Sequence, residues 1–286
     1  MDEHGLEYRY KVYRYFGDFF YVSCFSLILK HIMRLKCLGC EVLARAIYLC
    51  AAQSPHLVDV VLLERGLHNT PTKLRTQLQD QIDDSAAQGY DAVVLAYGLC
   101  GQATAGLISR GIPLAIPRAH DCITLFLGSR QRYQDQFEAS PGTYWYTQDY
   151  IEHSSDQGST LALGLGSDTD LQSVYAEYVE KYGRENADYL MEVMGAWQRH
   201  YQRAVYIDLG VGDGAAVEAY AQDEAARRGW AFERMAGDLV LIRRLLYGDW
   251  GDDSGSSSGS DFLILQPGQS VKTAYDDRII DCVDLS

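Results

Sequence analysis

The feature that most constrains the fold lies between residues 34 and 122, where short apolar segments alternate with segments of helical period. The apolar segments include RLKCLGC, LVDVVLL, YDAVVLAY and IPLAIP, and YDAVVLAY leads into a glycine-flanked cysteine. Continuous apolar runs are typical of strands that are covered on both faces. Strands that alternate with helices form βαβ units and hence parallel sheets. The sequence therefore predicts an α/β fold.

A second series of strand and helix patterns follows residue 153. RAVYIDLG, WAFERM and DFLILQPG have the pattern of strands, and residues 215–229 form an amphipathic pattern that ends at Gly229. A long helical stretch over residues 170–202 precedes them. We expect two Rossmann-like lobes with parallel sheets, residues 33–152 and 153–286, bridged by long helices. Residues 1–32 are expected to be an N-terminal extension outside the domain.

Composition narrows the class of protein. The chain has 286 residues, of which 47% are hydrophobic, so it can form a large core. Its formal net charge of −14 argues against nucleic acids and anionic membranes as partners, because both require a basic surface. The apolar run FFYVSCFSLIL has eleven residues, and a membrane span needs about 20. We expect no membrane span, although an interfacial or targeting segment is an alternative for this run.

The seven cysteines are odd in number and belong to a long, core-rich chain. This usage is not that of a small disulfide-stabilised secreted domain, and it predicts reduced thiols in the cytoplasm. Buried cysteines usually pack as small hydrophobic side chains. We expect that role for Cys24, Cys50 and Cys282.

Three other cysteines follow predicted strands: Cys40, Cys100 and Cys122. His68 follows a further predicted strand, LVDVVLL. Parallel strands end at one edge of their sheet, and ligands bind at that edge. We therefore expect these side chains to meet. Glycines next to Cys40 and Cys100 would let the backbone approach a ligand closely.

Thiolates select zinc or iron–sulfur clusters. Three cysteines leave one coordination position open, on a [4Fe–4S] cluster or on zinc, for a small-molecule substrate. Spacing does not choose between these metals. His120 is a candidate acid–base group or fourth ligand, with Asp121 beside it. His68 and Arg118 are candidate substrate contacts, and a structural salt bridge is the alternative for Arg118.

The segment YIDLGVGDG is a competing signal. A strand ends at Asp208, and Gly210 and Gly212 follow before a helix. This pattern resembles the first nucleotide-binding motif of S-adenosylmethionine-dependent methyltransferases, whose glycines let a loop approach the adenosyl group. Glycine-rich turns between strands and helices are common, so a plain tight turn is the alternative.

The segments GLHNTP, AYGLCG, IPRAHDCITLFLGSRQRY and PGTYWYT occur in this order. With them the chain resembles the bacterial and archaeal family called domain of unknown function 1638, over roughly residues 35–280. The family pattern implies the positions Cys40, His68, Cys100, His120, Asp121 and Cys122. The family brings no assigned reaction, and its context implies corrinoid methyl-transfer proteins as partners.

Three functional hypotheses follow. The first is a metal protein, in an inter-lobe cleft, that acts on a small thiol, methyl or sulfur compound. The second is a non-catalytic accessory protein that handles a metal, a cluster or a corrinoid. The third is a methyltransferase that uses the turn at residues 208–214. The sequence does not decide whether the protein is an enzyme. The tyrosine-rich segment of residues 174–190 predicts an interface between lobes or subunits, so a homodimer is one expected assembly.

Overall fold

The computed structural model describes residues 32–153, 201–251 and 260–285, together with positions 179, 183, 184, 187 and 188. The predicted N-terminal extension lies outside the described residues, apart from Ile32. Most of the predicted bridging helix and the serine-rich loop of residues 252–259 also lie outside them. No helix in the described part of the chain is long and apolar enough to cross a membrane.

The larger of the sheets has five strands in the order β2-β1-β3-β4-β8. β1 (Arg34–Cys40), β2 (Leu57–Leu63), β3 (Ala92–Ala96) and β4 (Leu114–Pro117) are parallel. β8 (Phe262–Leu265) pairs with β4 in the antiparallel direction. The prediction of a mixed α/β fold with a largely parallel sheet is therefore confirmed.

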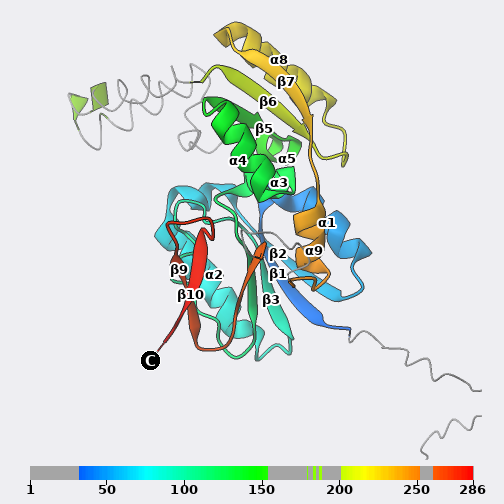
Figure 1. The fold of residues 1–286 in the computed structure, drawn as a ribbon, viewed down its shortest axis with the longest axis vertical. Helices are drawn as coiled ribbons and strands as arrows, with labels where there is room; N and C mark the ends of the chain where they lie inside the picture. The colour runs from blue at the N-terminus through cyan, green and yellow to red at the C-terminus, as the bar shows by residue number, and fades with distance from the viewer. Residues whose placement is uncertain are drawn as a thin grey trace, which may run out of the picture. The chain divides into compact units, whose positions relative to one another are not determined.

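Helices cover both faces of this sheet (Figure 1). α2 (Pro71–Ser85) contacts β1 and β3 from one side. On the other side, α1 (Ala44–Gln53) contacts α9 (Val240–Leu246), and α9 also contacts β3 and β4. All five residues of β3 are buried, because its side chains meet helices on both faces. The buried thiols of Cys37 and Cys50 are part of this core.

A smaller sheet holds β5 (Thr143–Tyr146), β6 (Arg203–Asp208) and β7 (Ala231–Ala236), which are parallel. α8 (Ala215–Arg228) covers it and ends at Gly229 in the left-handed conformation, as the sequence predicts. Each of the two parallel sheets contains strands from both sides of residue 152. The two Rossmann-like lobes with a boundary at that residue stay a prediction.

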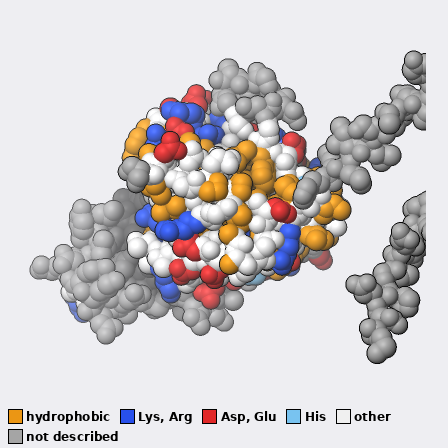
Figure 2. Space-filling view, turned by 90° about the horizontal axis from the view of Figure 1, so that it is seen from below, with side chains coloured by type: hydrophobic (Ala, Val, Ile, Leu, Met, Phe, Trp, Pro, Cys, Tyr) orange, Lys and Arg blue, Asp and Glu red, His pale blue; other side chains and the backbone are white. Residues whose placement is uncertain are grey.

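A hairpin of β9 (Gln269–Thr273) and β10 (Ile280–Asp284) completes the described strands. The Gly106 N–H donates to the Val271 carbonyl oxygen at 2.7 Å, and the Ser109 N–H donates to the Gln269 carbonyl oxygen at 2.9 Å. These bonds fix β9 beside the loop that connects β3 and β4. Figure 2 shows the molecule from the end at which β1 begins, where apolar side chains lie among acidic and basic ones.

The end of the larger sheet at which β1, β2, β3 and β4 finish carries several short elements. η1 (Glu41–Leu43) follows β1 directly, and η2 (Arg65–Asn69) follows β2. α3 (Cys122–Leu127) and α4 (Arg130–Ala139) follow β4, and Gly128 in the left-handed conformation separates them. α5 (Gln148–Glu152) comes after β5 and contacts η1. This end of the sheet holds the predicted ligands.

We predict that shortening a side chain in the centre of the larger sheet destabilises the whole domain. Leu38 in β1 is fully buried, so Leu38→Ala should lower the free energy of unfolding by about 2–5 kcal/mol through lost contacts and a residual cavity. Leu57 in β2 is 63% exposed, and Leu57→Ala should change the free energy of unfolding by less than about 0.5 kcal/mol. Urea unfolding followed by circular dichroism measures both, and equal losses would contradict this description of the core.

Candidate functional site

Three of the predicted ligands meet at one end of the larger sheet. Cys40 is the last residue of β1, Cys100 lies in the loop after β3, and Cys122 is the first residue of α3. The Cys122 thiol interacts electrostatically with Cys100 and Cys40, and Cys100 interacts with Cys40. The three strands thus bring together cysteines that are far apart in the sequence. Their role as metal ligands stays a prediction.

Two loops that carry cysteines are joined through their backbones. The Leu99 N–H donates to the Ala119 carbonyl oxygen at 2.8 Å, and the Cys100 N–H donates to the His120 carbonyl oxygen at 3.0 Å. A Cβ atom at Gly98 would stand 2.7 Å from the backbone nitrogen and Cα of Asp121, closer than such atoms can approach. Glycine at position 98 therefore permits the contact between the loops that places Cys100 near Cys122.

The backbone around Cys100 is strained. Cys100 has a φ of +45° and Gln102 a φ of +73°, which are left-handed values that side chains other than glycine rarely adopt. A left-handed conformation of such a residue costs on the order of 1–3 kcal/mol, and strained residues of this kind are often found at functional sites. The Arg75 guanidinium holds the loop by donating to the carbonyl oxygens of Gln102 at 2.7 Å and Ala103 at 3.3 Å.

Burial keeps the three thiols protonated in the protein without metal. Cys40 is 9% exposed, whereas Cys100 and Cys122 are half-buried. Burial raises the pKa of Cys40 to about 11 and that of Cys100 to about 12, and it raises the pKa of Cys122 strongly. The nearby Asp121 carboxylate raises the pKa of Cys100 and Cys122 further. A bound metal cation would favour the thiolates.

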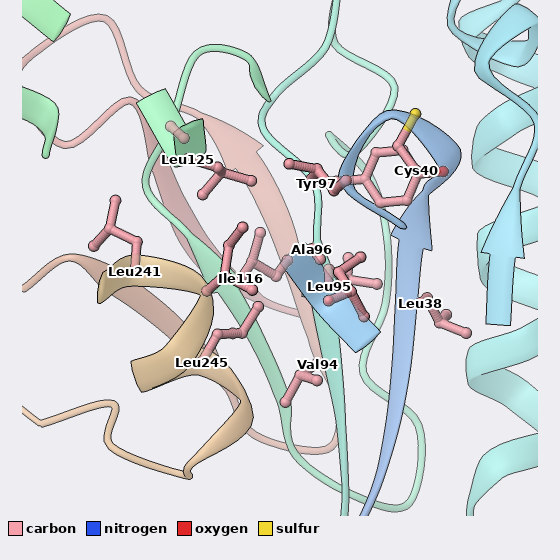
Figure 3. Close-up of a cluster of buried hydrophobic side chains, with 14 of the residues drawn as sticks. Leu38, Cys40, Val94, Leu95, Ala96, Tyr97, Ile116, Leu125, Leu241 and Leu245 are labelled. Atoms are coloured by element: carbon pink, nitrogen blue, oxygen red, sulfur yellow. The ribbon is translucent and has the colours of Figure 1, made fainter. Parts of the chain in front are cut away.

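Tyrosines that the sequence did not single out surround the thiols. The Tyr97 hydroxyl lies next to the Cys40 sulfur and donates to the Gly39 carbonyl oxygen at 3.2 Å. Figure 3 shows Tyr97 and Cys40 together at the end of β1, beyond the apolar side chains of the core. Tyr133 and Tyr150 each interact electrostatically with Cys122. Three phenol groups therefore border the cluster.

Arg65, at the start of η2, is a further residue that the sequence did not indicate. Its N–H donates to a Glu41 carboxylate oxygen at 3.1 Å, and its guanidinium donates to the Tyr150 carbonyl oxygen at 3.3 Å. The guanidinium also lies 4.7 Å from the centre of the Tyr150 ring. Its positive charge lowers the pKa of Cys40, against the larger effect of burial.

The two residues of the predicted acid–base pair differ in exposure, because Asp121 is half-buried and His120 is exposed. One Asp121 carboxylate oxygen accepts the Ile123 N–H at 2.9 Å and so caps α3, while the other accepts the Tyr133 hydroxyl at 3.2 Å. Burial raises the pKa of this carboxyl. His120 is exposed, and its ring centre lies 6.2 Å from that of Tyr133. Asp121 therefore holds the helix that begins with Cys122, and the catalytic roles of both residues stay predictions.

The two predicted substrate contacts lie apart. His68 is half-buried in η2, the helix that begins with Arg65, and burial lowers its pKa. The Arg118 guanidinium instead faces the hairpin, where it donates to the carbonyl oxygens of Arg278, at 3.0 Å, and Ile280. η2 thus belongs to the same end of the sheet as the cysteines, whereas Arg118 connects β4 with β10. Substrate binding by either residue stays a prediction.

The glycine-rich turn lies after β6 in the smaller sheet. The Asp208 carboxylate accepts the Gly210 N–H at 2.9 Å and the Arg234 guanidinium at 2.5 Å, and these two bonds lower its pKa. Gly210 and Gly212 have φ values of +66° and +82°, so both positions favour glycine. The Asp208 carboxylate therefore stabilises the turn and links it to β7. Cofactor binding by Asp208, Gly210 and Gly212 stays a prediction.

Within the described residues, no three His, Cys, Asp or Glu side chains stand in an arrangement that would hold a metal ion as they are. The cysteines are gathered as neutral thiols, and the Tyr97 hydroxyl lies next to one of them. A metal would require side chains that share this end of the sheet to rearrange.

The fold and the site define a class: an α/β protein with a largely parallel sheet and a three-cysteine cluster at the sheet's C-terminal edge. A family model described as a protein of unknown function (DUF1638) matches residues 62–246. The chain belongs to this family, which confirms the resemblance expected from the sequence. The matched residues contain Cys100 and Cys122, and Cys40 precedes them. No curated protein and no solved structure matches the chain.

We predict that Gly98→Ala separates the two loops. The new methyl group would meet the Asp121 backbone, which cannot yield as a flexible side chain would. Cys100 and Cys122 should then react with an uncharged maleimide more than about tenfold faster, through local opening of the loops. Gly66→Ala is the matched control, because a Cβ there meets nothing within 4 Å. Equal reactivity of the two variants would contradict the proposed role of Gly98.

The raised thiol pKa values predict a pH dependence of stability for the protein without metal. The folded state keeps protons on Cys40 and Cys100 up to about pH 11–12, whereas unfolded cysteines lose them near pH 8.5. Stability from this source is complete below about pH 8.5 and is lost as the pH rises toward 11–12. The urea midpoint of the wild type should therefore fall over this range more steeply than that of Cys40→Ala/Cys100→Ala. Parallel curves would show that burial does not perturb these thiols.

Proposed function

We propose that Cys40, Cys100 and Cys122 hold a metal centre, either a [4Fe–4S] cluster or a zinc ion. The observation that carries this proposal is the meeting of three thiols from three different strand ends, with mutual electrostatic interaction. Three thiolates are a ligand set typical of both metals. A single buried cysteine would be explained by packing, but three at one edge of a parallel sheet favour a ligand set.

The surroundings of the thiols support the same proposal. Thiols that are kept protonated by burial release their protons when a metal binds, so the affinity for metal should rise with pH. The Tyr97 hydroxyl would donate to the Cys40 thiolate, and Arg65 would compensate negative charge next to it. Asp121 fixes the start of α3 and with it the position of Cys122. The chain thus supplies both ligands and residues that orient them.

We propose further that the centre lies between two Rossmann-like lobes, each built around one of the parallel sheets. Two contacts favour this arrangement. The Asp238 N–H, just after β7, donates to the Phe126 carbonyl oxygen of α3 at 2.9 Å. Arg45 in α1 forms ion pairs with Asp149 and, at 2.6 Å, with Glu152, both in α5. These contacts link the cysteine end of the larger sheet to elements of the smaller one.

A metal with three protein ligands supplies a position at which a small thiol, methyl or sulfur compound is activated. Cys100 and Cys122 are half-buried residues, so this end of the sheet is where such a compound would approach the thiols. His120, exposed beside them, is the group proposed to exchange protons with it. An accessory protein that carries the metal without turnover would use the same three ligands, and corrinoid methyl-transfer proteins are its proposed partners. The Asp208 carboxylate is already occupied, so we do not propose a methyl donor at that turn.

The experiment that tests this function is metal analysis of cysteine variants purified without air. Cys100→Ser and Cys122→Ser should each lose most of the metal, because a serine hydroxyl does not replace a thiolate ligand. Cys282→Ser is the matched control, since that half-buried cysteine lies in β10. It should keep the metal content of the wild type. Full metal content in both Cys100→Ser and Cys122→Ser would contradict the proposal.

A further inference from the structure

Arg65 is a buried cation without a carboxylate partner in the described part of the chain. Only 9% of the residue is exposed. No described Asp or Glu oxygen lies within 4.0 Å of its guanidinium. The Glu41 carboxylate, just after β1, accepts the backbone N–H of Arg65, and one of its oxygens lies 3.9 Å from Nδ1 of His153. The guanidinium charge is therefore not neutralised by an acidic side chain described here.

A buried charge of this kind is costly unless an anion accompanies it. The carbonyl oxygen and the ring of Tyr150 orient the guanidinium and partly replace its water, at 3.3 Å and 4.7 Å. Neither group carries a negative charge. Arginine presents a planar fork of N–H donors that matches a carboxylate or phosphate group. Among the described residues, the Arg65 guanidinium thus meets a carbonyl oxygen and an aromatic ring but no carboxylate.

The positively charged Arg65 lies beside the cysteine cluster. In the parallel pairing of β1 and β2, Cys40 lies opposite Leu63, so Arg65 stands two residues beyond the end of that pair. Tyr150, whose ring lies against the guanidinium, also interacts with Cys122. Arg65 is therefore beside the cluster, between the elements that carry Cys40 and Tyr150.

We propose that Arg65 binds the anionic group of the substrate, so that the site takes a small compound with both a metal-binding sulfur and a carboxylate or similar anion. This inference rests on the proposed function and narrows its substrate class. A thiol bound at the open position would extend its anionic end to Arg65. A role for Arg65 that is limited to compensating the charge of the thiolates makes a different prediction, which the following experiment separates.

The test compares two probes of similar size, mercaptoacetate and 2-mercaptoethanol, on the metal-containing protein purified without air. Calorimetric titration measures each dissociation constant, and elemental analysis after titration checks that the metal stays bound. The wild type should prefer mercaptoacetate. Arg65→Gln should weaken mercaptoacetate binding roughly 10- to 100-fold, the value of a charge-assisted hydrogen bond, and leave 2-mercaptoethanol binding within about twofold. Arg65→Lys should restore part of the preference, because the charge remains.

Arg110→Gln is the matched control, because Arg110 is exposed and pairs with Asp83 at 3.1 Å on the surface. It should keep the preference of the wild type. An equal affinity of the wild type for both probes, or for neither, overturns the inference, as does an unchanged preference in Arg65→Gln. A wild-type protein without metal contradicts the proposed function itself and removes the inference with it, so the two failures are distinguishable.

Discussion

The contact between Gly98 and the backbone of Asp121 is the constraint on which the candidate site depends. Parallel strands alone would bring β3 and β4 to the same edge, but the loops beyond them would be free to diverge. The absence of a side chain at Gly98 lets the loops approach, and the hydrogen bonds of Leu99 and Cys100 to the other loop hold them there. Cys100 takes up a left-handed conformation in the same turn. The backbone strain is thus located at one of the three proposed ligands.

Much of the larger sheet could be predicted because its signals are local. The strand at Arg34–Cys40 is one of the apolar runs from which the parallel sheet is predicted. Strand pairing is less local. The segment that forms β8 is predicted to lie in a second lobe, but it pairs with β4 of the larger sheet. β5, which is not among the predicted strands, begins the smaller sheet. A four-residue strand gives little periodicity to detect, and its partner is chosen by the tertiary fold.

The cysteines of the candidate site could be predicted from the sequence, whereas the residues around them could not. Cysteines next to glycines at strand ends are rare enough to notice, and the topology rule then places them together. Arg65 and Tyr97 gave no such signal, because arginine and tyrosine are common on surfaces and in cores. Their importance comes from burial and from neighbours that are distant in the sequence, such as Tyr150 for Arg65. Arg118 shows the reverse case: its motif was conspicuous, yet its guanidinium is held by carbonyl oxygens of the hairpin.

The most direct test of the central claim is to purify the protein without air and measure metal and free thiols together. Zinc, or iron matched by inorganic sulfide, should be present, and Cys40, Cys100 and Cys122 should resist alkylation until a chelator removes the metal. Absorbance near ~400 nm would identify the iron–sulfur form. Protein that carries neither metal, with the same alkylation of these three thiols before and after chelation, would contradict the account.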